Sequence, residues 1–420
     1  MTRAVALAAA VGGLAVAFAG CGGAHRTPAK VPGTTLTVYS SLPMHGASST
    51  QSQAIVNGAR LALADAGGMV GVYRIHYLAL DNTKPSNALP SSSSVRAVAN
   101  RAARDRTTIG YLGDDNSDST KASLPILARA DIAQVIPSST DVGLTRDRRG
   151  AAHGEPGKFR PGGRQTYARI VPNDLVQAGA LAQLAKRDGC AAIAIWSTGS
   201  TYSNGLAANL AIAAERVGLR VDGSHAIDPS ASNYRRLARG ITADCFVFTG
   251  EIEENAVAAI KDAGQAHPRM RLYAGNGMAV DDIADAHRGL PRELAARFKT
   301  VAAPGNPAEL PAAGRRFIAR YVHAYGASAA DPYAIYGYEA MSLLLDSLRR
   351  AGARANDRAA VTEALLATRN RASVLGTYSI DRNGDTTRTS FGVLTIAGGR
   401  LRQDRDVVAS ASLRGGFPPR

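Results

Sequence analysis

Cysteine, tryptophan and the usual catalytic motifs are scarce in this chain of 420 residues, which has three cysteines and one tryptophan. No Cys-x-x-Cys pair or cysteine–histidine cluster occurs, so a structural zinc site is not expected. The sequence also lacks a Gly-x-Ser-x-Gly elbow, a His-Glu-x-x-His pair and a phosphate-binding loop. Gly275 and Gly277 lack the third glycine of a dinucleotide motif. We therefore expect no enzyme and no cofactor, although an α/β enzyme stays open because one fold hosts many chemistries.

Acidic residues are fewer than basic ones, which gives a net charge of +15. The arginines are scattered over polar helix faces, without the aromatic side chains that stack on bases. We expect no nucleic-acid partner. A basic surface resting near anionic lipid is the simpler interpretation.

Long apolar runs are absent except at the N-terminus. Arg3 precedes a short run rich in Ala and Gly, which is too short for a comfortable membrane span and predicts a signal peptide over residues 1–20. The residues before Cys21 resemble the lipobox of bacterial lipoproteins, which implies cleavage before Cys21 and lipid attachment to it. Residues 21–33 would then form a flexible tether on the outer side of the cytoplasmic membrane.

Cys190 and Cys245 stand at the starts of two predicted strands. Aligning the strand ends leaves the two sulfurs about three residues out of register, and strands rise by about 3.3 Å per residue. That offset favours two buried free thiols over a disulfide, which stays open as the alternative.

Strands and amphipathic helices alternate from Thr34 onward, and the alternation restarts after Asp174. This pattern predicts two successive doubly wound α/β units. Between them lies a basic segment rich in Gly and Pro, residues 145–165, which we expect to be a disordered or mobile surface insertion.

Two segments, "DDNSDST" and "DRNGDTT", share the Asp-x-Asn-x-Asp spacing of a calcium loop. Neither has Gly at the sixth position, and Pro125 and Gly392 stand where the last glutamate should be. We predict no metal site. The first segment fits a helix cap, and the second fits a hairpin that turns at Asn383 and Gly384.

Hydroxyl groups crowd two turns that follow predicted strands. "GDDNSDST" supplies Ser117, Ser119 and Thr120 at a helix start, and "IPSST" supplies Ser138 and Thr140. Helix starts offer free backbone N–H groups, so these turns suit an anion such as a carboxylate, although ordinary helix capping would explain each turn alone.

From Thr35 to Leu401 the chain resembles the leucine/isoleucine/valine-binding protein family, the extracytoplasmic receptors of branched-chain amino acid ABC importers. The segments that carry the resemblance are "NGARLALADAGG", "YLALDN", "SDST", "IPSST", "RIVPND", "YSNGLAANL", "FVFTGE", "DPYAIYGYEA" and "DRNGD". Each segment is weakly specific alone, but together they occur in family order.

The resemblance implies a type I periplasmic-binding fold, with two Rossmann-like lobes joined by a hinge of three chain crossings. The crossings would divide the chain into lobe 1 (34–173), lobe 2 (174–302), a return to lobe 1 (303–375), a return to lobe 2 (376–410) and a tail (411–420).

The resemblance also implies ligand contacts. The family's contacts to an amino acid carboxylate fall on Ser117, Ser138 and Thr140, and its aromatic lid residue falls on Tyr202. Asn276 stands where the family commonly has a carboxylate for the ligand amine.

Two further pocket positions depart from the family, with Glu251 and Gln51 in place of aromatic residues. A buried ammonium needs an acceptor, so we predict that Glu251 pairs with the ligand amine, with Asp114 and Asp115 as alternatives. A solvated acid at a helix start would also explain Glu251.

The predicted function is capture of a small ligand, an amino acid or related amide, for delivery to an ABC permease. A receptor that signals to another membrane partner is the alternative.

Overall fold

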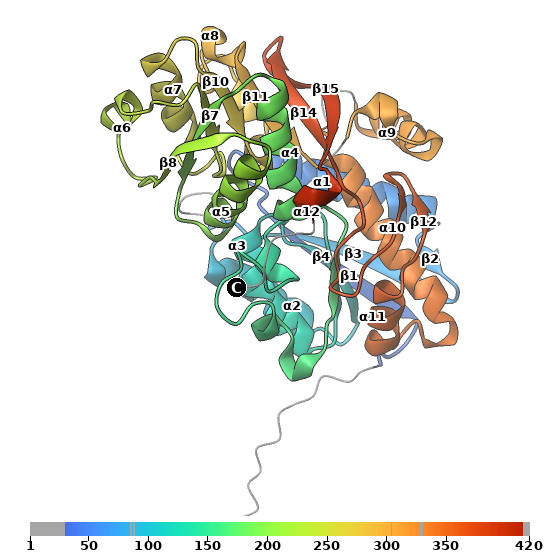
Figure 1. The fold of residues 1–420 in the computed structure, drawn as a ribbon. Coiled ribbons are helices and arrows are strands. Elements are labelled where there is room, and N and C mark those ends of the chain that lie inside the picture. Colours follow the sequence, from blue (N-terminus) through green and yellow to red (C-terminus); the bar gives the residue numbers. More distant parts are fainter. Residues whose placement is uncertain (1–29, 85, 87–88, 304, 327–330, 415–420) are drawn as a thin grey trace, which may run out of the picture.

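The computed structural model describes residues 30–84, 86, 89–303, 305–326 and 331–414, which form two α/β lobes stacked one above the other (Figure 1). The predicted signal peptide and Cys21 lie outside these residues. Each lobe is a twisted sheet flanked by helices, as the alternation of strands and helices predicts.

Lobe 1 is built on a six-stranded sheet with the order β2-β3-β1-β4-β5-β6. The strands are β1 (Thr35–Leu42), β2 (Met69–Val70), β3 (Tyr73–Asp81), β4 (Thr108–Gly113), β5 (Ala133–Ile136) and β6 (Tyr167–Arg169). All pairings except that of β2 with β3 are parallel. β1 is buried on both faces after its first residue, which explains its nearly continuous run of apolar and small residues.

Helices cover both faces of this sheet. They are α1 (Ser49–Asp65), α2 (Ser92–Arg104), α3 (Ser117–Arg129), α9 (Ala312–Tyr325), α10 (Ala334–Ala351) and α11 (Arg358–Leu366). One of them, α9, packs on α1 and α10 instead of on the strands. α1 and α10 cross in close contact because each has a glycine at the crossing. A Cβ atom on Gly58 would lie 2.0 Å from the Ala334 carbonyl oxygen, and one on Gly337 would lie 2.0 Å from that of Ile55.

Lobe 2 contains a seven-stranded sheet with the order β15-β14-β11-β10-β9-β7-β8. The strands are β7 (Ala192–Ser197), β8 (Arg220–Ala226), β9 (Cys245–Phe248), β10 (Arg271–Ala274), β11 (Phe298–Ala302), β14 (Ser390–Ala397) and β15 (Arg400–Val408). The helices are α4 (Asp174–Arg187), α5 (Thr201–Arg216), α6 (Arg235–Arg239), α7 (Ala256–Ala266), α8 (Arg292–Ala295) and α12 (Ala411–Arg414).

The chain crosses between the lobes after β6, after β11 and before β14. The third crossing comes later than Gly376, where we expected it. β12 (Arg371–Ser373) pairs with β13 (Gly376–Tyr378), and the Tyr378 hydroxyl donates to Glu339 on α10 over 2.7 Å. The β12–β13 hairpin therefore still belongs to lobe 1.

A buried ion cluster joins the first and third crossings. The Asp385 carboxylate accepts from the Arg169 Nε over 2.7 Å, from the Asn173 side chain over 3.1 Å, and from Arg146. Arg169 is fully buried. Although burial raises the pKa of Asp385, the two guanidinium groups outweigh it and lower this pKa to about 2.

The predicted turn at Asn383 and Gly384 forms, but the expected hairpin does not extend from it. A single antiparallel bridge, between Ile380 and Thr386, flanks the turn. β14 pairs instead with β15, the next strand along the chain.

The basic segment 145–165 packs on lobe 1, where we expected a disordered or mobile insertion. Phe159 is only 2% exposed, and Glu155 is bonded to Lys121 of α3 over 2.9 Å. The apolar cluster around Phe159 consists of Leu124, Ile136, Leu144 and Tyr167. Phe159 and Glu155, together with the bond from Arg146 to Asp385, thus hold a segment whose composition predicts a loop.

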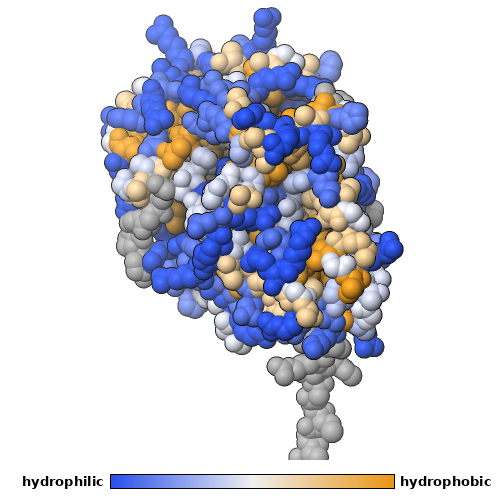
Figure 2. All heavy atoms as spheres, turned by 90° about the vertical axis from the view of Figure 1, so that its right-hand side faces the viewer, coloured by the Kyte–Doolittle hydropathy of each residue, from blue (hydrophilic) through white to orange (hydrophobic). Residues whose placement is uncertain are grey.

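The predicted tether also ends in contact with lobe 1. Val31 is 1% exposed, and its N–H donates to the Asn356 carbonyl over 2.7 Å. In the part of the chain that the structure describes, no helix is long and apolar enough to cross a membrane. The face shown in Figure 2 is mainly hydrophilic, with scattered hydrophobic areas.

Cys190 and Cys245 form a disulfide with a Cα–Cα distance of 6.0 Å, so our preference for free thiols was wrong. The register offset was right, because Cys245 pairs with Ile193, three residues after Cys190. Cys190, however, precedes β7, which begins at Ala192, and therefore lies outside the strand register. Strand geometry therefore does not set the distance between the two sulfurs.

Replacing both cysteines by serine should lower the free energy of unfolding by roughly 3–4 kcal/mol, because the cross-link spans 55 residues and restricts the unfolded chain. Urea unfolding of the two proteins measures this difference. Reaction of both thiols with a thiol reagent in denatured, unreduced wild-type protein would contradict the disulfide.

Candidate ligand-binding cleft

A cavity of about 340 Å³ lies between the lobes. The turns that line it follow β1, β3, β4 and β5 of lobe 1, and β7, β9 and β10 of lobe 2. Ligands of open α/β sheets bind beyond the carboxyl ends of the strands, and this cavity lies at those ends in both lobes. Its volume is within the range of small-molecule sites.

The structure brings all six predicted ligand contacts to this one cavity. They are Ser117, Ser138, Thr140, Tyr202, Glu251 and Asn276. Gln51 also lines it, and its amide donates to the Ala279 carbonyl of lobe 2 over 3.4 Å.

The two polar turns of lobe 1 support each other. Asn116 caps α3 by accepting from the Ser119 N–H over 2.9 Å. The Ser138 hydroxyl donates to the Asp115 carbonyl over 2.6 Å, which holds the second turn against the first. The first N–H groups of α3 therefore lie at the cavity beside the Ser117 hydroxyl, an arrangement that suits an anionic group.

Tyr202 of lobe 2 is held by hydrogen bonds. Its hydroxyl lies 2.8 Å from the Asn276 side-chain oxygen and 3.1 Å from that of Gln177, and donates its one proton to either of them. A Cβ atom on Gly275 would lie 2.4 Å from this hydroxyl, so the glycine is needed for the close approach. The Asn276 amide in turn donates over 3.3 Å to Tyr333, which precedes α10 of lobe 1. This bond connects the lobes across the cavity.

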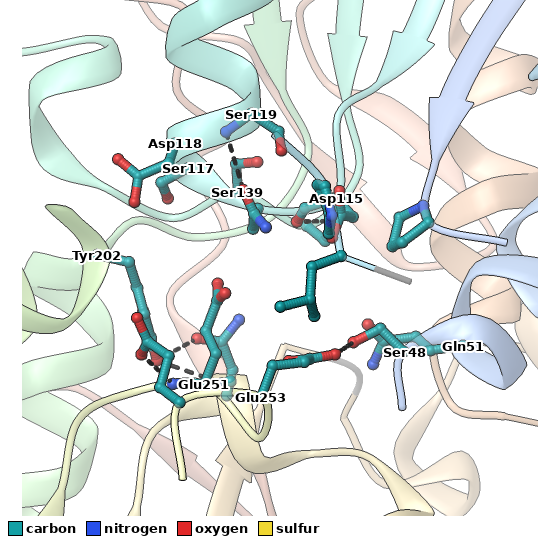
Figure 3. A pocket seen from close by; sticks show the side chains of 18 of the residues that line it. Ser48, Gln51, Asp115, Ser117, Asp118, Ser119, Ser139, Tyr202, Glu251 and Glu253 are labelled. Carbon is teal, nitrogen blue, oxygen red and sulfur yellow. Dashed lines mark hydrogen bonds between the residues drawn. The ribbon is translucent and has the colours of Figure 1, made fainter. Parts of the chain in front are cut away.

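The cavity is acidic. The acidic residues that line it are Asp115 and Asp118 from lobe 1, and Glu251, Glu253 and Glu254 from lobe 2 (Figure 3). Among the described residues that line the cavity, none is lysine, arginine or histidine.

These acids differ in their partners. Glu254 accepts from the Glu251 N–H over 2.8 Å, within its own turn. Glu253 accepts from the Ser48 hydroxyl over 2.6 Å, across the cleft. The Glu251 carboxylate has no hydrogen bond or ion pair with any described residue, and the Asp115 Oδ1 atom is buried without a hydrogen-bond partner.

Burial and like charges raise the pKa values of these groups. Burial raises the pKa of Asp115 to about 7, with further contributions from the charges of Asp114 and of Glu253 in the other lobe. Burial also raises the pKa of Glu251 well above its ordinary value, and Glu254, Glu253 and Asp115 add to the shift. Both carboxyls therefore favour a proton or a cationic partner.

Asp114, one of our alternatives for the amine contact, does not line the cavity. It is fully buried and accepts from the Ser123 hydroxyl over 2.5 Å. Burial raises its pKa to about 6. Asp114 therefore stabilises the turn after β4 from the interior of lobe 1, away from the cavity.

The sequence analysis missed several cavity residues, among them Ser48, Glu253 and Tyr333. The segment "TGEIEE" with its three acids was a signal for Glu253. Nothing in the sequence indicates that Ser48 and Glu253, which are 205 positions apart, meet across the cleft.

Solved structures share this fold. A leucine-binding protein from Thermotoga maritima aligns with a TM-score of 0.75 at 22% identity, over 89% of this chain and 99% of that one. A branched-chain amino acid transporter substrate-binding protein from Streptococcus pneumoniae, in complex with isoleucine, aligns with a TM-score of 0.69 at 15% identity, over 89% and 99% of the two chains. A solute-binding protein of an ABC transporter from Rhodopseudomonas palustris, in complex with p-hydroxybenzoic acid, gives 0.73 at 15% identity, over 90% and 98%.

Curated proteins give no match to this sequence. The family model described as "Periplasmic binding protein" matches residues 37–400, which is most of the chain. The predicted fold and family resemblance are therefore confirmed. The protein belongs to the periplasmic binding protein family, which implies an extracytoplasmic location and a binding role rather than an enzymatic one.

Proposed function

We propose that this protein is a lipid-anchored solute-binding protein that captures an amino acid or related amide in the interlobe cleft and delivers it to an ABC importer permease. The observation that carries the proposal is that the start of α3, whose first N–H groups suit an anion, and the Glu251 carboxylate line the same cavity. A free amino acid carries the two complementary charges, one carboxylate and one ammonium.

The ligand carboxylate would bind on the lobe 1 side. Ser117 and Thr140 line the cavity there beside the start of α3, where backbone N–H groups lack intrahelical acceptors. A carboxylate at this point is favoured by hydrogen bonds and by the helix dipole. Ser138 contributes by fixing the geometry of the turn, because its hydroxyl already bonds to Asp115.

The ligand ammonium would bind to Glu251 of lobe 2. A desolvated ammonium is costly without an acceptor, and this carboxylate has no partner among the described residues. Pairing the two would also lower the pKa of Glu251 towards its ordinary range, because an opposite charge stabilises the carboxylate.

An aromatic acid fits the cleft less well. The Rhodopseudomonas palustris structure contains p-hydroxybenzoic acid, which has a carboxylate and no ammonium. In the present cleft such an anion would join five acidic residues with no basic residue among the described lining. Charge repulsion in a poorly solvated site disfavours this ligand class.

The anchor and the permease rest on the sequence and the family. The signal-like N-terminus with Cys21 supports lipid attachment, and many structures with this fold are substrate-binding proteins of ABC transporters. Ligand bound between the lobes would favour the closed form, which the permease would recognise.

L-amino acids should raise the melting temperature of the purified protein, whereas their deaminated analogues should not, because only the amino acids supply the ammonium that pairs with Glu251. Saturating ligand at a thousandfold excess over Kd stabilises by about 4 kcal/mol, so the shift should be plain. A shift with amides or benzoates and none with amino acids would contradict the amine site.

Glu251→Gln should weaken amino acid binding at least tenfold in calorimetry, because it removes the charge that offsets the ammonium. Glu363→Gln is the matched control, since it removes an exposed carboxylate on α11 of lobe 1 and should leave binding unchanged. Unchanged affinity of Glu251→Gln would show that another group holds the amine.

The ligand-free protein should melt at a lower temperature at pH 8 than at pH 5. Asp115 and Asp174 have pKa values raised to about 7 by burial, above the ordinary value near 4. The folded state therefore holds more protons than the unfolded state between pH 4 and pH 7, and stability falls as pH rises through this interval. Asp115→Asn should reduce the fall, and a melting temperature that rises with pH would contradict the shifts.

A further inference from the structure

We propose that the cleft selects an α-amino acid whose side chain ends in a cation, as in lysine or ornithine, and that Asp115 and Glu253 together hold that side-chain cation. The inference rests on the proposed function, because it takes Glu251 and the start of α3 as the site of the amino acid head group. The new element is the positive charge on the side chain of the bound amino acid.

The cavity has two ends that differ in chemistry (Figure 3). At one end Ser117 and Tyr202 face Glu251, and at the other Asp115 faces Glu253, beside Ser48. The first end suits the carboxylate and ammonium of the head group. The second end combines two carboxylates from opposite lobes, with no basic residue among the described lining.

The charges at the second end are not balanced by the protein. The Asp115 Oδ1 atom is buried and has no hydrogen-bond partner, while Glu253 accepts from the neutral Ser48 hydroxyl. Glu254 accepts from the Glu251 N–H and from the Thr198 hydroxyl, and Asp118 is exposed. A zwitterionic ligand with an apolar side chain would leave Asp115 and Glu253 uncompensated, whereas a side-chain ammonium or guanidinium would pair with both.

The described acids of the cleft do not form a cluster of three metal ligands. Within the described ranges, the group of three metal-ligand side chains whose donor atoms lie within 4.8 Å of one another is Cys190, Asp244 and Cys245, and these cysteines are bonded to each other. The described acids of the cleft form no such group of three. Calcium usually takes about six to eight oxygen ligands, so we assign the cation to an organic side chain.

The position of the two acids also connects ligand charge to lobe closure. Asp115 lies on lobe 1 and Glu253 on lobe 2, and the charge of Glu253 contributes to the raised pKa of Asp115. Closing the cleft without a cation therefore brings like charges together. A cationic side chain reverses this repulsion in the closed form alone, which is the differential affinity that ligand-driven closure requires.

The first test compares L-lysine with L-norleucine, whose side chain lacks the terminal amine, by calorimetry on the purified full chain. Lysine should bind at least tenfold more tightly, and its affinity should fall more steeply with salt. Equal or tighter binding of norleucine would overturn this inference and leave the proposed function standing. If neither amino acid bound, nor leucine or glutamine, both proposals would fail.

The second test assigns the preference to the two acids. Glu253→Gln retains an acceptor for Ser48, and Asp115→Asn retains the backbone carbonyl that Ser138 contacts. Each variant should reduce the lysine-to-norleucine affinity ratio at least fivefold, because it weakens the binding of lysine and removes an uncompensated charge from the complex with norleucine.

Glu363→Gln again serves as the control for net charge and should keep the wild-type ratio. A ratio that persists in both cleft variants would overturn the assignment. If calcium chloride at constant ionic strength displaced lysine, Asp115 and Glu253 would be ligands of a metal ion. That result would overturn the inference of an organic side-chain cation.

Discussion

Carboxylates from two lobes share one poorly solvated cleft, and this constraint governs how the protein can work. Asp115 stands on one side, and Glu251 and Glu253 stand on the other. Burial and mutual repulsion raise the pKa values of Asp115 and Glu251, so these carboxyls favour either a proton or a cationic ligand. The approach of the two lobes is thus coupled to the charge in the cleft. A neutral or anionic solute does not offset the negative charge of these carboxylates.

The acidity of the cleft contrasts with the net charge of the whole chain, which is +15. The two act over different ranges. At physiological ionic strength charges on the surface are screened within about 8 Å, whereas buried charges are screened much less. The net charge of the surface and the charge of the cleft are therefore largely independent of each other, and the proposed ligand preference follows from the cleft carboxylates alone.

Much of this could be predicted from sequence because the carboxyl ends of parallel strands meet at one edge of a sheet. That rule placed Ser117 and Thr140 beside each other, and the resemblance placed them opposite Glu251. It could not predict the disulfide, because Cys190 precedes β7 and lies outside the strand register. Nor could it predict contacts between distant turns, such as that of Ser48 with Glu253, which depend on how the lobes are oriented.

Two of the three chain crossings are tied to each other by Asp385, which binds Arg169 from the first and itself belongs to the third. Independent crossings would allow the lobes to twist as well as to bend. Because a buried ion pair holds these two together, the hinge loses degrees of freedom and its motion approaches rotation about one axis. Each closure then returns the same atoms to the same positions, so a ligand meets one reproducible site instead of a family of loosely related ones.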